Sequence, residues 1–128
     1  MSDYRRLRVP GATWFFTVNL ADRGRTTLTD HIGVLRAAYR ATVAEHPVFC
    51  DAMVVMPDHL HAVWTLPQGD ADYSVRWRKI KGRFTHGIRR VGFQPTAPTQ
   101  SKVAKAEAGV WQRRFWEHLV RDEDEYAH

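Results

Sequence analysis

Polar and apolar residues alternate in the middle of the chain, directly after Pro57-Asp58. Every second position there is apolar, and the set reads Leu60, Ala62, Trp64 and Leu66. This period of two predicts a β-strand over residues 59–66, because successive side chains of a strand point to opposite faces. One face is therefore expected to pack against the protein, while His59 and His61 project together from the other.

The hydrophobic pattern divides the rest of the chain into short elements. Strands are predicted over residues 13–20, 48–56 and 110–119, and the second forms a hairpin with residues 59–66. One helix is expected to begin at a cap on Thr29 or Asp30 and to end at His46-Pro47, and a second covers residues 73–87. Their predicted inward residues are Ile32, Leu35, Tyr39 and Val43, followed by Val75, Ile80 and Phe84.

The order strand, helix, strand, strand, helix, strand predicts a ferredoxin-like α+β domain with helices on one face of an antiparallel sheet. The 128 residues suit a single domain over residues 1–128. A basic arm is expected over residues 1–12, and a flexible loop rich in Gly, Pro and Ser over about residues 88–109. A last helix is predicted to start at Asp122.

Basic residues outnumber acidic ones, which gives a formal net charge of +5 and an isoelectric point near 9.8. This balance favours a polyanionic partner, although a charged face can also serve only for solvation. The candidate nucleic-acid contacts lie in the arm, on one face of the second helix and near the last strand. They are Arg5, Arg6, Arg8, Arg76, Arg78, Lys79, Arg83, Arg113 and Arg114.

The single cysteine, Cys50, excludes an internal disulfide and is expected to be a buried thiol in the second strand. No segment has the apolar core of a signal peptide or the length to cross a bilayer. We therefore expect a cytoplasmic protein with no membrane partner. Trp111 and Trp116, in the last strand, are expected in the core.

His59 and His61 carry the candidate chemistry. Two imidazoles on one face of a strand can share a divalent metal ion through one ring nitrogen each. A carboxylate, an amide or a third imidazole would have to complete the site. Without such a partner, the pair reads as two surface histidines.

Several motifs together resemble a known family. They are Trp14-Phe15-Phe16-Thr17-Val18-Asn19-Leu20, Met56-Pro57-Asp58-His59-Leu60-His61, Trp64-Thr65-Leu66-Pro67 and Trp111-Gln112-Arg113-Arg114-Phe115-Trp116-Glu117-His118. In this order, over nearly the whole chain, they look like the REP-associated tyrosine transposases, a group of single-tyrosine HUH transposases. HUH denotes His-hydrophobe-His.

The resemblance implies a ferredoxin-like fold and a metal-dependent endonuclease and strand transferase for single-stranded DNA. Mg²⁺ or Mn²⁺ would be held by His59, His61 and a third polar ligand, and a tyrosine would form a 5′-phosphotyrosine intermediate. The implied partner is single-stranded or hairpin DNA, from REP-type palindromes with a GTAG-type flank. The protein would be nucleoid-associated in a bacterial cytoplasm, as a monomer or a homodimer.

The end of the sequence departs from the family pattern. Tyr126 matches the first of two family tyrosines, and the second is the one associated with catalysis. The nucleophile and the third ligand are therefore expected beyond residue 128, which would make this form cleavage-deficient. Tyr126 remains a candidate nucleophile, and His118 a candidate third ligand.

A non-catalytic nucleic-acid-binding module of the same fold is the alternative. Such modules expose aromatic residues on their two central strands, whereas Trp64 is expected on the face opposite His59 and His61. A phosphoesterase with paired His-x-Ser/Thr motifs is excluded, because the sequence has one histidine cluster, which reads His-Leu-His.

Overall fold

The structure of the protein, a computed structural model, describes residues 8–92 and 109–121. Its four strands form an antiparallel sheet in the order β2-β3-β1-β4. The strands are β1 (Thr13–Asn19), β2 (Phe49–Val55), β3 (His59–Thr65) and β4 (Trp116–Val120), and the helices are α1 (Thr27–Asp30), α2 (Ile32–Glu45) and α3 (Tyr73–Arg90). This arrangement confirms the ferredoxin-like prediction.

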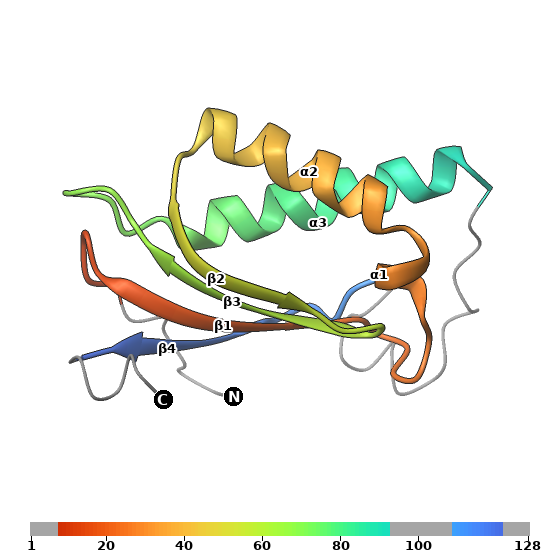
Figure 1. Ribbon diagram of the computed structural model, residues 1–128, viewed down its shortest axis with the longest axis horizontal. Helices are drawn as coiled ribbons and strands as arrows, with labels where there is room; N and C mark the ends of the chain where they lie inside the picture. The colour runs from red at the N-terminus through yellow and green to blue at the C-terminus, as the bar shows by residue number, and fades with distance from the viewer. Residues whose placement is uncertain (1–7, 93–108, 122–128) are drawn as a thin grey trace.

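The two long helices lie side by side over one face of the sheet and leave the other face open (Figure 1). The core fills the space between the layers, where Trp64 of β3 stacks on Trp77 of α3 with ring centroids 4.2 Å apart. Phe16 of β1 packs edge-on against both rings. Large aromatic rings bury much apolar area, so these contacts are expected to carry a large share of the stability.

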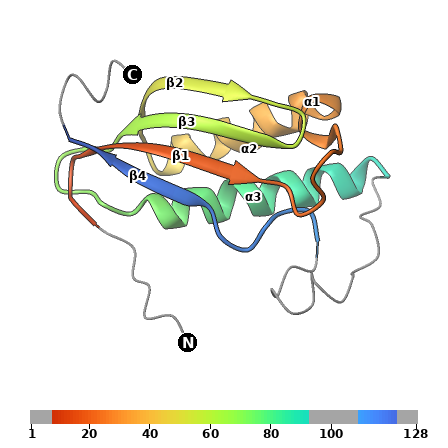
Figure 2. The same cartoon turned by 90° about the horizontal axis from the view of Figure 1, so that it is seen from below.

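The strand register fixes which side chains meet on the open face, seen from below in Figure 2. Thr17 of β1 pairs with His61 of β3 on one side and with Trp116 of β4 on the other. Asn19 pairs with His59. Directly paired residues of antiparallel strands lie on the same face with neighbouring Cβ atoms, so all five residues belong to the open face.

Several predicted boundaries are wrong. Thr29 and Asp30 lie inside the separate one-turn helix α1, and α2 begins only at Ile32. Helix α3 continues through the fully buried Ile88 to Arg90, so the segment predicted as a loop begins with helix. Strand β4 is shorter than expected because Trp111 turns toward α3, where its indole nitrogen donates to the carbonyl of Lys81 at 3.1 Å.

Two burial predictions also fail, both on the edge strands. Cys50 of β2 is exposed, and Trp116 of β4 is 53% exposed. The expected burial holds for Trp111, which is 8% exposed. Trp116 lies on the open face, which the helices leave uncovered, and Cys50 lies on an edge strand, which has a neighbour on only one side.

Some predictions fall outside the described residues. They concern Arg5 and Arg6, Tyr126, the helix expected after Asp122, and residues 93–108 of the predicted loop. Within the described ranges, none of the helices has both the length and the apolar character needed to span a bilayer.

Candidate metal and DNA site

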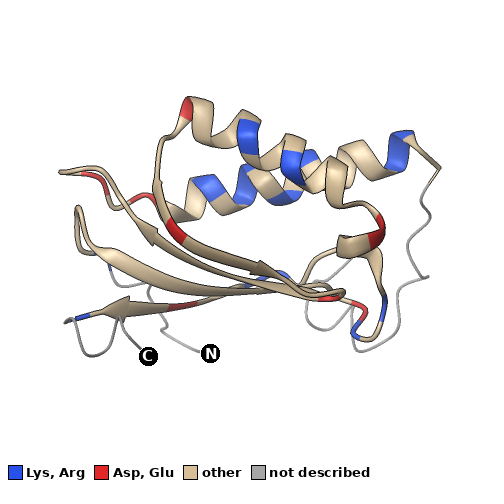
Figure 3. Cartoon of the chain, in the orientation of Figure 1, with Lys and Arg blue, Asp and Glu red and all other residues tan. Residues whose placement is uncertain are grey.

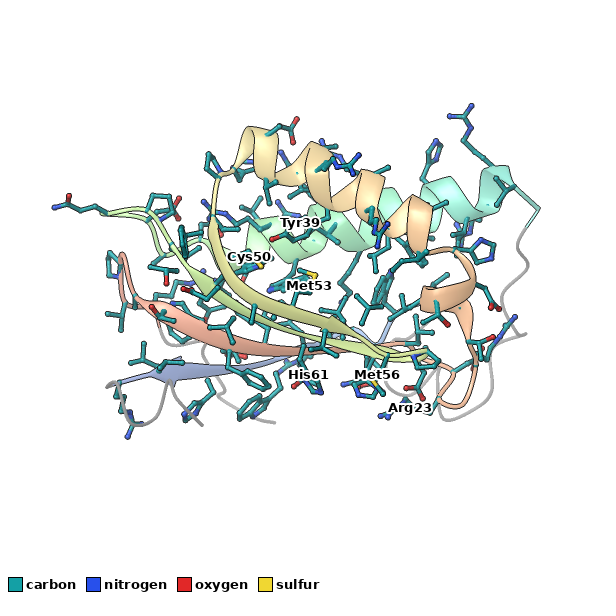
Figure 4. The ribbon with its side chains drawn as sticks, viewed as in Figure 1. Arg23, Tyr39, Cys50, Met53, Met56 and His61 are labelled. Carbon is teal, nitrogen blue, oxygen red and sulfur yellow. The ribbon has the colours of Figure 1, made fainter. Side chains whose placement is uncertain are left out.

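The two histidines of β3 lie on the open face, away from the helices. Their neighbours Leu60, Ala62 and Trp64 are buried beneath the helices, while both imidazoles are half-buried. The ring centroids of His59 and His61 are 5.0 Å apart and the planes meet at 77°. In Figure 4, His61 projects below the sheet while α2 and α3 lie above it. The predicted orientation of the pair is therefore confirmed.

A carboxylate holds the ring of His59. The Nδ1 atom of His59 lies 2.7 Å from Oδ1 of Asp58. A histidine that donates Nδ1–H to a carboxylate keeps its lone pair on Nε2, which is how metal-binding imidazoles are commonly oriented. Asp58 thus sets both the tautomer and the direction of the His59 ring.

Asp58 also joins the β2–β3 turn to the loop after β1. Its Oδ2 atom accepts from Nε of Arg23 at 3.0 Å and from the backbone N–H of Gly24 at 2.8 Å. Gly24 has a φ of +90°, a conformation that favours glycine. The bond to His59, then the Gly24 amide and Arg23, hold the pKa of the Asp58 carboxyl far below its usual range. Asp58 is therefore an anion in the folded protein.

His61 is held by the neighbouring strand. Its Nδ1 atom lies 2.9 Å from the hydroxyl of Thr17, the cross-strand partner. When Nδ1–H donates to this hydroxyl, Nε2 carries the lone pair. Burial, followed by the charge of His59, lowers the pKa of His61. A lowered pKa favours the neutral imidazole, which is the form that binds metal ions.

The described residues supply two strong ligands. No group of three or more His, Cys, Asp or Glu side chains that could hold a metal ion occurs within residues 8–92 and 109–121. His118 instead stacks on Trp116, with ring centroids 5.6 Å apart, and so does not join the pair. The donor set therefore fits a divalent cation at two positions and leaves the others to water, DNA or another ligand.

Asn19 is a candidate ligand that the sequence did not single out. It lies directly across from His59 on the open face, where its amide oxygen is suited to a hard divalent cation. The strand register that reveals it was not part of the sequence reasoning. A search for polar residues on the strand paired with the His-x-His strand would have found it.

Arg76 was predicted to contact DNA, and the structure contradicts this. Its side chain is only 1% exposed. It donates to both carboxylate oxygens of Asp70, at 3.1 and 2.8 Å, and to the carbonyls of His46 and Pro47 at 2.9 and 2.7 Å. Arg76 thus fastens the end of α2 to α3. Helical spacing places Arg76 on the buried side of α3, three residues after Tyr73 and four before Ile80, and so separates it from the exposed cations.

The other basic residues of α3 lie on the helix layer, on the far side of the sheet from the histidines (Figure 3). Lys79 and Arg83 both pair with Glu45 of α2, at 3.3 and 2.6 Å, so an acid of the neighbouring helix balances part of this basic face. These bonds hold the pKa of Glu45 below its usual range. Arg78 is exposed and makes no hydrogen bond or ion pair with the described residues.

The remaining predicted contacts lie near the ends of the sheet. Arg8 donates to the carbonyl of Ala71 and the hydroxyl of Ser74, both at 3.2 Å, and is thereby tied to the start of α3. Arg113 and Arg114 are exposed and lead into β4. Of the basic candidates, these two are the nearest in sequence to a strand, since Arg114 lies two residues before β4 begins.

Two named proteins are similar to this chain in sequence. The chain is 42% identical over 128 residues to the REP-associated tyrosine transposase of Escherichia coli, covering 100% of this chain and 67% of that protein. The chain belongs to the REP-associated tyrosine transposase family. It is also 39% identical over 127 residues to a Haemophilus influenzae protein that carries the same name provisionally, covering 99% of this chain and 70% of the relative.

A solved structure of a REP-associated tyrosine transposase bound to a REP hairpin has the same fold, with a TM-score of 0.83 at 42% identity. The alignment covers 100% of this chain and 67% of that one, so the chain spans about two thirds of the length of these transposases. No family model matches the sequence. The family predicted from the motifs is thus confirmed, and the protein belongs to a class of transposases.

Proposed function

We propose that this protein binds REP-type DNA hairpins and, in its catalytic form, nicks and rejoins the adjacent single strand with the help of a divalent cation. The observation that carries the proposal is the pair of imidazoles on the open face, each held through Nδ1. Two rings fixed in this way offer their Nε2 atoms to a common ligand. The hairpin-bound relative supports the choice of DNA partner.

His59 and His61 would hold Mg²⁺ or Mn²⁺, with Asn19 as a third candidate ligand. When bound, such a cation offsets the negative charge that develops on the scissile phosphate. Asp58 and Thr17 would orient the two rings before DNA arrives, so little ordering would remain to be done in the complex. The open face is suited to a polymeric substrate, which must pass across the site rather than enter a closed cavity.

The reaction is a transesterification. A tyrosine oxygen attacks phosphorus, a 5′-phosphotyrosine bond forms, and the bond to the 3′-oxygen breaks. The phenol loses its proton to the surroundings and the departing 3′-oxygen gains one, so no net proton is consumed. Since one ester replaces another, the strand can be rejoined without ATP.

Phosphate contacts near the open face would come from Arg113 and Arg114, which precede β4. Arginine is suited to this role because its planar guanidinium can hold a phosphate through two hydrogen bonds. Arg78 lies on the other layer and would contact only DNA that passes around the sheet edge. The arm residues Arg5, Arg6 and Arg8 remain candidates for phosphate contacts.

The test is to incubate the 128-residue protein with Mn²⁺ and a hairpin oligonucleotide that carries a 5′-GTAG flank, and to look for a covalent adduct on a denaturing gel. An adduct that His59→Ala abolishes and that His86→Ala, an exposed histidine on α3, leaves unchanged would place the nucleophile within residues 1–128. Loss of the adduct in Tyr126→Phe would assign the nucleophile to Tyr126. Hairpin binding without any adduct would place the nucleophile outside residues 1–128.

The non-catalytic module is the second candidate, and one observation favours it. The described residues contain no cluster of three or more His, Cys, Asp or Glu ligands. Under this alternative, hairpin binding would be the same in Mn²⁺ and in EDTA, and His59→Ala would not change it. A flat salt dependence of binding would speak against both candidates, because phosphate contacts weaken steeply as salt rises.

A further inference from the structure

A run of aromatic rings crosses the open face beside the histidine pair. Phe15 of β1 stacks on His61, with centroids 5.3 Å apart and planes at 20°, and meets the edge of Trp116 at 5.9 Å. Trp116 in turn lies parallel to His118, at 5.6 Å and 4°. We call Phe15, Trp116 and His118 the aromatic platform. It begins at the proposed metal ligand and ends on the edge strand β4.

Trp116 differs from the other tryptophans of the chain. Trp14, Trp64, Trp77 and Trp111 are between 0% and 8% exposed, whereas Trp116 is 53% exposed. An exposed large ring does not contribute the stabilising free energy that its burial would give, and such rings commonly mark binding surfaces. The contacts with Phe15 and His118 hold the indole in place, so little side-chain freedom remains to be lost when a ligand stacks on it.

The register places Trp116 at a useful distance from the histidines. Thr17 is the cross-strand partner of both His61 and Trp116, so these two residues lie in one row, separated by two strand spacings. That separation is roughly 10 Å. A DNA strand whose phosphate sits at His59 and His61 can therefore place a neighbouring base over the indole.

The surroundings favour a nucleic acid over an apolar partner. Exposed Arg113 and Arg114 lie just before β4 and exposed Arg121 just after it. Cationic side chains beside an aromatic ring are the usual combination for single-stranded DNA, in which the bases stack on rings and the phosphates meet arginines.

We propose that Trp116 is a base-stacking residue that holds an unpaired nucleotide next to the phosphate bound at His59 and His61. Phe15 and His118 are positioning residues for the indole. This inference rests on the proposed function, since it needs single-stranded DNA at the histidine pair. The proposal assigns to Trp116 the binding of the single-stranded flank of the hairpin rather than of its duplex stem. Stacking tolerates any base, so the platform contributes affinity and placement rather than sequence choice.

The test compares a hairpin carrying a single-stranded 5′-GTAG flank with the same hairpin lacking it. Affinities are measured by fluorescence anisotropy, with Mn²⁺ and again in EDTA, for the full chain and for Trp116→Ala. We expect the variant to bind the flanked hairpin about ten-fold more weakly, and the flankless hairpin as tightly as the unmodified protein does. Phe49→Ala, which removes a 68% exposed ring from the other edge strand, should change neither affinity.

Single abasic sites locate the stacked nucleotide. At one flank position, the loss of the base should weaken binding of the unmodified protein and have no further effect on Trp116→Ala. Trp116→Phe supplies a milder second variant that retains a ring. Quenching of tryptophan emission by the flanked hairpin should be smaller in Trp116→Phe, because the stacked indole is then absent.

The outcomes separate the two proposals. Equal binding of the flanked hairpin by Trp116→Ala and the unmodified protein would overturn the stacking role while leaving hairpin binding intact. An equal loss on both hairpins would also overturn it, since the ring would then support the fold or the stem. Failure of the unmodified protein to bind either hairpin would overturn the proposed function, and the stacking role with it.

Discussion

The two faces of the sheet use the same kinds of side chain in opposite ways. On the covered face, the rings of Trp14 and Trp77 pack tightly, although their indole nitrogens have no hydrogen-bond partner among the described residues. On the open face, the Nδ1 atom of His59 has Asp58 as its partner and the Nδ1 atom of His61 has Thr17. Packing on one face outweighs unsatisfied polar atoms. On the other, hydrogen bonds orient two half-buried rings, one of which also stacks on Phe15.

The largest expected effect is on the free energy of unfolding, when one tryptophan is removed from the covered face and one from the open face. Trp64→Ala deletes a fully buried ring that stacks on Trp77, and should lower the free energy of unfolding by about 3–5 kcal/mol. Trp116→Ala should lower it by about 1 kcal/mol or less, because its ring is largely in solvent. Urea denaturation measures both values. Similar losses in the two variants would mean that Trp116 is part of the core in solution.

A second comparison concerns two arginines of α3, one on its buried face and one exposed. Arg76→Ala breaks a buried ion pair and should cost about 3 kcal/mol in the free energy of unfolding. Arg78→Ala should cost less than about 0.5 kcal/mol, because its side chain is exposed. Urea denaturation of the two variants at neutral pH checks this order, and equal costs would contradict it.

Acid should reduce the cost of Arg76→Ala. The hydrogen bonds from Arg76 hold the pKa of Asp70 below its usual range. A carboxyl whose pKa is lower in the folded than in the unfolded state stabilises the protein above its unfolded value of about 4, and this stabilisation is lost as pH falls through the folded-state pKa. The gap between Arg76→Ala and the unmodified protein should therefore narrow below about pH 4. A gap independent of pH would mean that Arg76 acts only through its contacts with the carbonyls of His46, Pro47 and Asp72.

The contrast between the faces explains what the sequence could predict. Alternation along residues 59–66 was enough to put His59 and Trp64 on opposite faces, because that property is local to one strand. Residues whose surroundings come from distant segments were not predictable. Asp58 meets Arg23 and Gly24, and Arg76 meets the end of α2, through tertiary contacts that no local period encodes. Trp116 was expected in the core because the sequence alone does not show which face of the last strand the helices cover.

The smallest expected effect distinguishes two threonines on the open face of β1. Thr17→Val removes the hydroxyl that orients His61 and should weaken Mn²⁺ binding by about ten-fold, as the loss of a residue behind a metal ligand commonly does. Thr13→Val is the matched control, since Thr13 lies on the same face of the same strand and bonds the hydroxyl of Thr65 at 2.7 Å, away from the histidines. Isothermal titration calorimetry with Mn²⁺ in the absence of DNA measures both affinities. If the two variants bind Mn²⁺ equally well, His61 does not depend on Thr17 for its orientation, and packing of the ring against Phe15 must suffice.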